Sequence, residues 1–177
     1  MSFETVLASE QLYQGRIVKL RVDQVRTSTG LEAIREIVEH PGAVAIVAVD
    51  DQQRVVLVKQ YRHAVRALTI EIPAGTLEPD EDPLEAAQRE LREETGFTAD
   101  RFDPIGGIYP APGWSTEYIY LYVATGLTPG PMATEPDESI ELLRVPLPDA
   151  IDMIRSGAIN DGKSISALFL ARSRAVR

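Results

Sequence analysis

Residues 75–97 read GTLEPDEDPLEAAQRELREETGF, a stretch that predicts a loop followed by one amphipathic helix. Asp82 is a suitable N-cap, Pro83 suits the first helical position, and Glu85 completes an Asp-x-x-Glu capping box. Gly96 is a natural residue to end the helix. The apolar side chains recur at spacings that place them on one side, toward a core, and they are Leu84, Ala87 and Leu91.

The acidic residues near the end of this helix are poorly placed for stability alone. Glu90 and Glu94 are four residues apart and share a face, and Glu93 lies beside them. Arg89 can pair with Glu93, which leaves Glu90 and Glu94 uncompensated in a last turn that favours cations. A divalent cation would relieve this repulsion, and oxygen ligands suit Mg2+, Mn2+ or Ca2+. The alternative is an exposed helix that tolerates modest repulsion.

The turn before the helix offers a further ligand. Pro73, Ala74 and Gly75 follow an expected strand, and the carbonyl oxygen of Ala74 would add a neutral donor. Gly75 lets the backbone approach the helix or a ligand closely. An ordinary turn is the alternative for this glycine.

Hydrophobic patterns predict short strands and helices on both sides of this stretch. Strands at residues 17–22 and 31–38 flank the turn TSTG at 27–30, which favours an N-terminal antiparallel hairpin or meander. Further strands are expected at residues 43–49, 54–60, 68–72, 117–124 and 140–145, and helices at residues 148–156 and 164–175. Residues 126–138 read as a long loop, a kind of segment that often carries function.

Composition excludes several classes of function. The chain has 177 residues, a formal net charge of −9 and no cysteine, so thiol catalysis, thiolate zinc sites and disulfides are excluded. The negative charge argues against binding to nucleic acid or a membrane surface, and the longest apolar run, at residues 43–49, is too short to cross a membrane. The first ten residues do not look like a signal peptide, and we expect a cytoplasmic protein.

The spacing of fixed residues in this stretch resembles the Nudix box, G-x5-E-x7-R-E-U-x-E-E-x-G-U, in which U is apolar. Gly75, Glu81 and the run RELREETGF at 89–97 meet every fixed position. The flanking segments are similar to the ADP-ribose pyrophosphatase branch of this family, and they are VKQYR at 58–62, EIPAG at 71–75, YPAPGWS at 109–115 and DESIE at 137–141.

The resemblance implies an α/β fold, a Nudix-like α/β/α sandwich around a mixed β-sheet, preceded by antiparallel N-terminal strands. It divides the chain into residues 1–40, which would serve dimerisation and the substrate site, and residues 41–177, the hydrolase domain. A homodimer is implied because, in this branch, the N-terminal strands of one subunit complete the adenosine site of the other.

The implied reaction is Mg2+-dependent hydrolysis of the pyrophosphate bond of ADP-ribose to AMP and ribose 5-phosphate, with Mn2+ as another suitable metal. By resemblance, Glu90 and Glu94 are the main metal ligands, Glu93 lies near a second ion, and the Ala74 carbonyl completes the shell. Arg89 would orient Glu93. Bound cations would also offset the repulsion between an acidic protein and a polyanionic substrate.

A general base must take a proton from the attacking water. In the ADP-ribose branch it comes from the acidic loop outside the box, and the match is Glu138, which also counts as a candidate metal ligand, with Glu141 in reserve. The alternative is that Asp137, Glu138 and Glu141 are only solvated charges of a loop and a strand edge. Glu81 would position the loop or bind metal through water.

The candidate substrate-binding residues are Arg35, Glu36, Arg62, Gly113 and Glu117. Arg35 and Arg62 are candidates to hold phosphate or the terminal ribose because arginine offers fixed bidentate donors, and ordinary ion pairs are their alternative. Glu117 follows the Pro-Gly loop and would touch ribose. Trp114 in that loop would stack on a ring or anchor packing.

Residues 157–164, GAINDGKS, fit the phosphate-binding pattern G-x4-G-K-S. That loop needs a strand before it. A helix is expected there instead, so the segment is interpreted as a turn between helices with Asp161 near an N-cap.

The sequence alone is compatible with two other functions. One is a Nudix pyrophosphatase that acts on another nucleotide sugar or a dinucleotide, because pocket residues decide the substrate. The other is a sensor that binds ADP-ribose without cleaving it, and the complete box argues against it.

Overall fold

The computed structural model describes residues 3–133 and 139–175. The chain forms two compact units. The first comprises Met1–Gly42 and Tyr109–Tyr118, and the second comprises Ala43–Ile108 and Ile119–Arg177.

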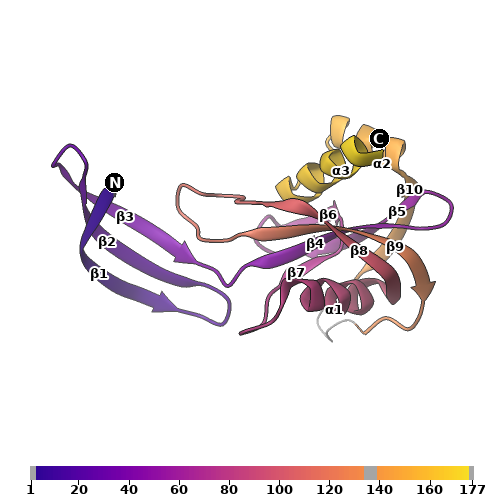
Figure 1. Cartoon of the computed structure of the whole chain (residues 1–177), viewed down its shortest axis with the longest axis horizontal. Coiled ribbons are helices and arrows are strands. Elements are labelled where there is room, and N and C mark those ends of the chain that lie inside the picture. Colours follow the sequence, from indigo (N-terminus) through magenta and orange to yellow (C-terminus); the bar gives the residue numbers. More distant parts are fainter. Residues whose placement is uncertain (1–2, 134–138, 176–177) are drawn as a thin grey trace. The chain divides into compact units, whose positions relative to one another are not determined.

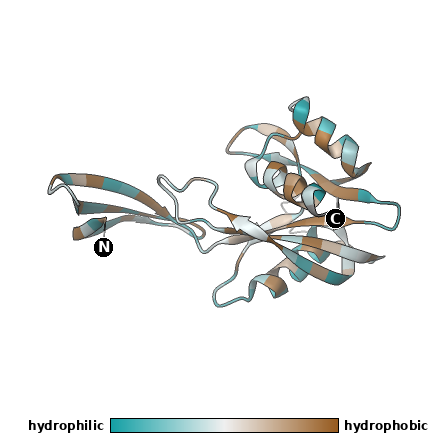
Figure 2. Ribbon diagram, turned by 45° about the horizontal axis from the view of Figure 1, so that its top comes forward, coloured by the Kyte–Doolittle hydropathy of each residue, from teal (hydrophilic) through white to brown (hydrophobic). Residues whose placement is uncertain are grey.

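The first unit contains an antiparallel sheet in the order β1, β2, β3, with bounds Glu4–Gln14, Lys19–Thr27 and Glu32–Glu39 (Figure 1). The expected N-terminal meander is therefore confirmed, but the sequence pattern missed β1. Every residue of β1 is exposed, so no buried face imposes the strict alternation that reveals a strand. Figure 2 shows that both hydrophobic and hydrophilic residues occur on these strands.

Residues 109–118 join the first unit through backbone hydrogen bonds to the end of β3. The Val38 N–H donates to the Trp114 carbonyl at 2.8 Å, and the Thr116 N–H donates to the Val38 carbonyl at 3.0 Å. Val38 and Ser115 form a parallel bridge. A segment from the middle of the chain thus belongs with its first 42 residues.

The second unit is built on a mixed sheet with the strand order β10-β5-β4-β9-β8, to which β6 adds at β5 and β7 adds at β4. Strands β4 and β9 are parallel, whereas the other pairs are antiparallel. The bounds are β4 Ala43–Val49, β5 Arg54–Arg62, β6 Ala67–Glu71, β7 Ala74–Thr76, β8 Phe97–Ile108, β9 Ile119–Pro129 and β10 Glu141–Pro146.

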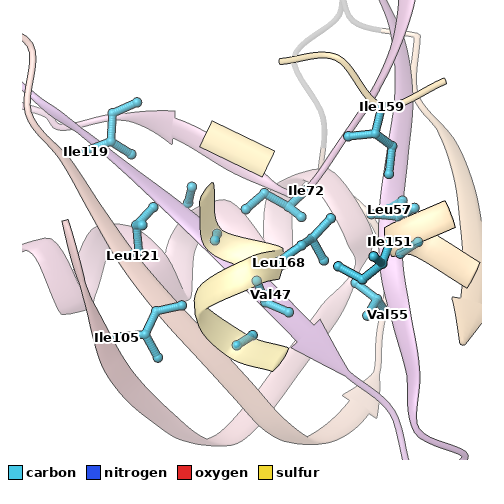
Figure 3. Close-up of a cluster of buried hydrophobic side chains, with 14 of the residues drawn as sticks. Val47, Val55, Leu57, Ile72, Ile105, Ile119, Leu121, Ile151, Ile159 and Leu168 are labelled. Carbon is cyan, nitrogen blue, oxygen red and sulfur yellow. The ribbon is translucent and has the colours of Figure 1, made fainter. Parts of the chain in front are cut away.

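Helices cover both faces of this sheet, which confirms the expected α/β/α sandwich (Figure 1). The helices are α1 Pro83–Thr95, α2 Leu147–Arg155 and α3 Gly162–Ala175. Alternate residues of β4 face opposite layers: Val44 and Ile46 pack with the α1 cluster, whereas Ala45 and Val47 pack with the cluster of α2 and α3. Figure 3 shows Val47 and Leu168 of α3 in the latter cluster.

The ends of α1 are as the sequence predicts. Asp82 accepts hydrogen bonds from the backbone of Leu84 and Glu85, and Gly96 adopts the left-handed conformation with φ 71°. Ala87 and Leu91 are buried, but Leu84 is 39% exposed, so its place in the apolar stripe was wrong. Leu84 lies in the first turn, where Ala86 is buried instead.

The long loop expected at residues 126–138 was wrong in its first part. Strand β9 continues to Pro129 and pairs with the beginning of β8, which the sequence analysis did not identify. Gly126 has a φ of 69° within β9, and a glycine followed by Pro129 resembles a loop although the ladder continues. Among the described residues, no helix is long and apolar enough to span a bilayer.

Candidate active site

The last turns of α1 carry glutamates that contact the preceding turn of chain. Glu94 is 5% exposed, and its Oε2 accepts a hydrogen bond from the Ala74 N–H at 2.9 Å. Ala74 lies in β7 and pairs with Ala45 of the central strand β4. The buried end of the helix is therefore tied through its carboxylate to the middle of the sheet.

Glu90 packs directly on Gly75. A Cβ atom built on Gly75 would lie 1.9 Å from both the Cδ and the Oε1 of Glu90, far inside contact distance. Gly75 does not have the positive φ that favours glycine, so this position needs glycine for space rather than for backbone conformation. The glycine in the sequence predicts this close approach, and the structure confirms it.

Arg89 gathers the carboxylates of this region. Its Nη1 lies 2.6 Å from Glu90 Oε1 and 3.2 Å from Glu93 Oε2, and its Nε lies 2.8 Å from Glu81 Oε1. The expected pair with Glu93 is confirmed, but the expectation that Glu90 lacks a cation was wrong. The guanidinium has five N–H donors in a fork, so one arginine contacts several carboxylates at once.

Glu81 holds the loop before the helix. Both of its oxygens bind Arg89, and Oε2 also accepts from the Glu78 N–H at 2.9 Å. The hydrogen bond from Arg89 lowers the pKa of the Glu81 carboxyl. Arg89 also donates to the Thr76 carbonyl, so one side chain joins the loop to the helix. This arrangement fits the loop-positioning alternative for Glu81.

The donors in this region suit a hard divalent cation. Four glutamates place carboxylate oxygens in this region and are offset by Arg89 and the more exposed Arg92, so the acids outnumber the bases. Within residues 3–133 and 139–175, however, no group of acidic or histidine side chains is gathered in coordination geometry. Three of the four carboxylates contact Arg89 instead, so the donor chemistry fits a metal while the present positions do not form its shell.

Arg62, at the end of β5, forms a bidentate pair with Glu71 at the end of β6. Arg62 Nε lies 3.0 Å from Glu71 Oε1, and Nη2 lies 2.7 Å from Oε2. The hydrogen bond to Glu71 raises the pKa of Arg62, and the charge of Glu94 adds to this effect. The candidate substrate-binding arginine therefore lies in the electrostatic field of Glu94 at the end of α1.

Four other candidate residues belong to the first unit. Arg35 Nη2 lies 2.5 Å from Glu4 Oε1 in an ion pair. Glu36 is exposed on β3. The Glu117 N–H donates a hydrogen bond to the Ser115 hydroxyl. A Cβ on Gly113 would meet open space. Their roles toward a substrate stay predictions.

Glu138, the predicted base, lies outside the described residues. Its reserve, Glu141, begins β10, where its Oε2 binds Lys59 Nζ at 2.8 Å. Glu141 is thus placed in an exposed ion pair across two neighbouring strands.

Sequence reasoning missed a cluster of charges around the buried Glu71, beside Arg62. Lys163 Nζ lies 2.5 Å from Glu71 Oε2 and 2.9 Å from Asp161 Oδ1. Glu71 ends a predicted strand, and an acid at such a position is a signal of a paired charge. Lys163 belongs to the segment that fits the phosphate-loop pattern. The interpretation of that pattern as a helix-to-helix turn is confirmed, and Asp161 caps α3 through the Ser164 N–H at 3.1 Å.

Comparisons with known proteins agree with this geometry. Residues 39–168 match the family model of the NUDIX domain, and residues 4–38 match that of the nucleoside diphosphate sugar hydrolase N-terminal domain. The chain is 40% identical over 167 residues to the methanol dehydrogenase activator of Bacillus methanolicus, covering 93% of this chain and 90% of that protein. It is 38% identical, with the same coverage of 93% and 90%, to the ADP-ribose pyrophosphatase of Bacillus subtilis (strain 168). A crystal structure of an ADP compounds hydrolase matches with a TM-score of 0.88 and 26% identity, covering 99% of this chain and 96% of that chain.

Proposed function

Because the chain belongs to the Nudix family, we propose that it hydrolyses the pyrophosphate bond of ADP-ribose, releasing AMP and ribose 5-phosphate, in a reaction that depends on Mg2+. The observation that carries this proposal is the contact between Glu90 and Gly75, which keeps a carboxylate of the box against the turn before the helix. The relative named ADP-ribose pyrophosphatase, which aligns with 93% of this chain, supports the substrate.

The residues that would hold Mg2+ are Glu90, Glu93, Glu94, Glu138 and the Ala74 carbonyl. Bound Mg2+ neutralises phosphate oxygens and lowers the pKa of a coordinated water. The chain prepares these donors in two ways. The Ala74 N–H fixes the orientation of the Glu94 carboxylate, and Arg89 holds Glu90 and Glu93 on the same side of the helix. Mn2+ prefers similar oxygen donors and would be an alternative metal.

The remaining chemistry belongs to groups outside the box. Glu138 would accept the proton of the attacking water, with Glu141 as the reserve base. Arg62 would bind the diphosphate, because a guanidinium is a fork of donors that matches phosphate oxygens. The other proposed substrate contacts are Arg35, Glu36, Gly113 and Glu117.

We also propose that residues 1–40 mediate a homodimer and contribute to the substrate site, and that the protein acts in the cytoplasm. Several large apolar residues of the first unit are more than half exposed, as expected for a surface that a second copy covers, and they include Val6, Leu12, Leu31 and Ile34. Sedimentation velocity at micromolar concentration tests the dimer, and a monomer under those conditions would refute it.

A substrate panel tests the activity. The protein is incubated with Mg2+ or EDTA and with ADP-ribose, other ADP-sugars, GDP-sugars, NADH and dinucleotides, and products are separated by chromatography. We expect the highest kcat/KM for ADP-ribose and no turnover in EDTA. Activity confined to NADH or GDP-sugars would remove the ADP-ribose assignment and leave the second candidate, another nucleoside diphosphate derivative.

A pair of variants tests whether the activity depends on the carboxylate face of α1. Glu94→Gln keeps an oxygen for the Ala74 N–H but loses the charge, so turnover should fall strongly while the fold persists. Glu85→Gln changes an exposed glutamate in the first turn of the same helix and should keep wild-type turnover. Wild-type rates in Glu94→Gln would contradict its role as a metal ligand.

A further inference from the structure

The first turn of α3 is tied to the end of β6 at two neighbouring points. Lys163 Nζ lies 2.5 Å from Glu71 Oε2, and the fully buried Ser164 hydroxyl accepts a hydrogen bond from the Ile72 N–H at 2.9 Å. Asp161 holds Lys163 at 2.9 Å while it caps the helix. Lys163 and Ser164, which fit the phosphate-loop pattern in the sequence, therefore contact the end of β6.

Glu71 is a buried carboxylate that two cations share. Its side chain is 3% exposed, and Arg62, Lys163 and the Thr69 hydroxyl, at 2.6 Å, all donate to it. Burial alone raises the pKa of the Glu71 carboxyl, but the bonds from Arg62 and Lys163 outweigh it and lower this pKa to about 2. A buried charge needs such partners, because taking it out of water is unfavourable.

Arg62 connects this cluster to the active site. Glu71 binds Nε and Nη2 of Arg62, which fixes the plane of the guanidinium. The side chain is 41% exposed, and the described residues provide no hydrogen bond to Nη1. Arg62 therefore has one edge bound by the protein and another edge available to a ligand, in the field of Glu94.

We propose that Lys163 is a positioning residue for the reaction, which holds Glu71 and thereby keeps Arg62 oriented and only partly neutralised for binding the diphosphate. The inference rests on the proposed function for the identity of the ligand. Two cations share one carboxylate, so Glu71 does not fully neutralise Arg62. Without Lys163, Glu71 would pair with Arg62 alone, and the attraction of Arg62 for phosphate oxygens would fall.

Steady-state kinetics with ADP-ribose test the first consequence. Lys163→Met should raise KM about tenfold, because it weakens ground-state binding by Arg62, and should change kcat by less than about twofold. Lys163→Arg keeps the cation and should restore most of the affinity. The matched control is Arg54→Met, which removes a partly buried ion pair with Asp50 at the other end of β5 and should leave KM unchanged.

A double-mutant cycle separates positioning from general structural damage. If Lys163 acts through Arg62, then Lys163→Met should have little further effect on KM in an Arg62→Ala background. Additive effects of the two substitutions on KM would overturn the proposal, as would an unchanged KM in Lys163→Met. The cycle is run with whichever nucleoside diphosphate derivative the wild type cleaves best, so a wrong substrate does not affect its outcome.

A substrate-free measurement distinguishes failure of this inference from failure of the proposed function. The Nε–H resonance of Arg62 in 15N NMR, assigned with Arg62→Lys, reports its hydrogen bond to Glu71. We expect this resonance to shift in Lys163→Met and to remain near its wild-type position in Lys163→Arg. An unshifted resonance in Lys163→Met would overturn the positioning role even if ADP-ribose is the substrate, and a shifted one would support it even if no substrate is found.

Discussion

The carboxylate of Glu90 fills the space where a side chain on residue 75 would begin, because a Cβ there would lie 1.9 Å from its Oε1. This contact explains a fixed glycine and a fixed glutamate fifteen positions apart by one steric requirement. The turn before α1 and the face of the helix that carries the glutamates are therefore fitted to each other.

Gly75→Ala should abolish most activity with a limited loss of stability. The new methyl group would displace Glu90, and misplacement of a catalytic group by about 1 Å typically reduces rate about 100-fold. Overpacking should reduce the free energy of unfolding by about 1–3 kcal/mol, measured by urea denaturation. Gly162→Ala is the matched control, because its Cβ would meet open space. Wild-type turnover in Gly75→Ala would contradict the importance of this contact.

Arg89→Ala should destabilise the protein more than any exposed arginine variant. Its loss leaves Glu81, Glu90 and Glu93 close together without their shared cation, which should lower the free energy of unfolding at pH 7 by about 2–3 kcal/mol. Arg92→Ala removes a 57% exposed side chain that lies 3.8 Å from Glu93 and should change this free energy by less than about 0.5 kcal/mol. Equal losses of unfolding free energy in the two variants would refute the role of Arg89 as the shared cation of Glu81, Glu90 and Glu93.

Glu138→Gln should lower kcat by about 100-fold or more, as expected for removal of a general base. Binding of Mg2+ measured by calorimetry should persist with reduced affinity, because Glu90, Glu93, Glu94 and the Ala74 carbonyl remain as proposed ligands. Glu141→Gln is the comparison. Glu141 is held in an exposed pair with Lys59, and its loss should keep kcat within about twofold of the wild type. Loss of kcat in Glu141→Gln with none in Glu138→Gln would reverse the assignment of the base.

The stability that Glu71 contributes should disappear in acid. Its pKa is lowered from 4.5 to about 2 in the folded state, so the ionised carboxylate stabilises the fold above pH 4.5. This contribution, up to about 3 kcal/mol, should decline as the pH falls from about 4.5 toward about 2. Urea denaturation of the wild type and of Glu71→Gln tests it. The difference between their free energies of unfolding should shrink across this interval, and a constant difference would refute it.

The sequence was sufficient for the parts of the fold that depend on local signals. Asp82 and Gly96 mark the ends of α1, and the apolar run of β4 identifies the central strand, because caps and buried strands have short-range signatures. Strand β1 was missed because its exposed residues need no alternation, and the continuation of β9 was missed because Gly126 and Pro129 resemble loop residues.

The candidate site was predictable where residues are neighbours on one helix. The shared face of Glu90 and Glu94 follows from helical spacing, but the contacts of Arg89 with both Glu81 and Glu90 depend on how the loop folds back. The Lys163–Glu71 pair joins residues 92 positions apart, and only the tertiary structure brings them together.

The polypeptide passes between its two units three times, after Gly42, after Ile108 and after Tyr118. Truncation at residue 42 would therefore not release an intact second module. It would leave residues 109–118 without the Val38 N–H and carbonyl, which form the backbone hydrogen bonds to Trp114 and Thr116. Any version of this protein that lacks its first 42 residues, made in evolution or in the laboratory, therefore needs a redesigned β8–β9 connection as well.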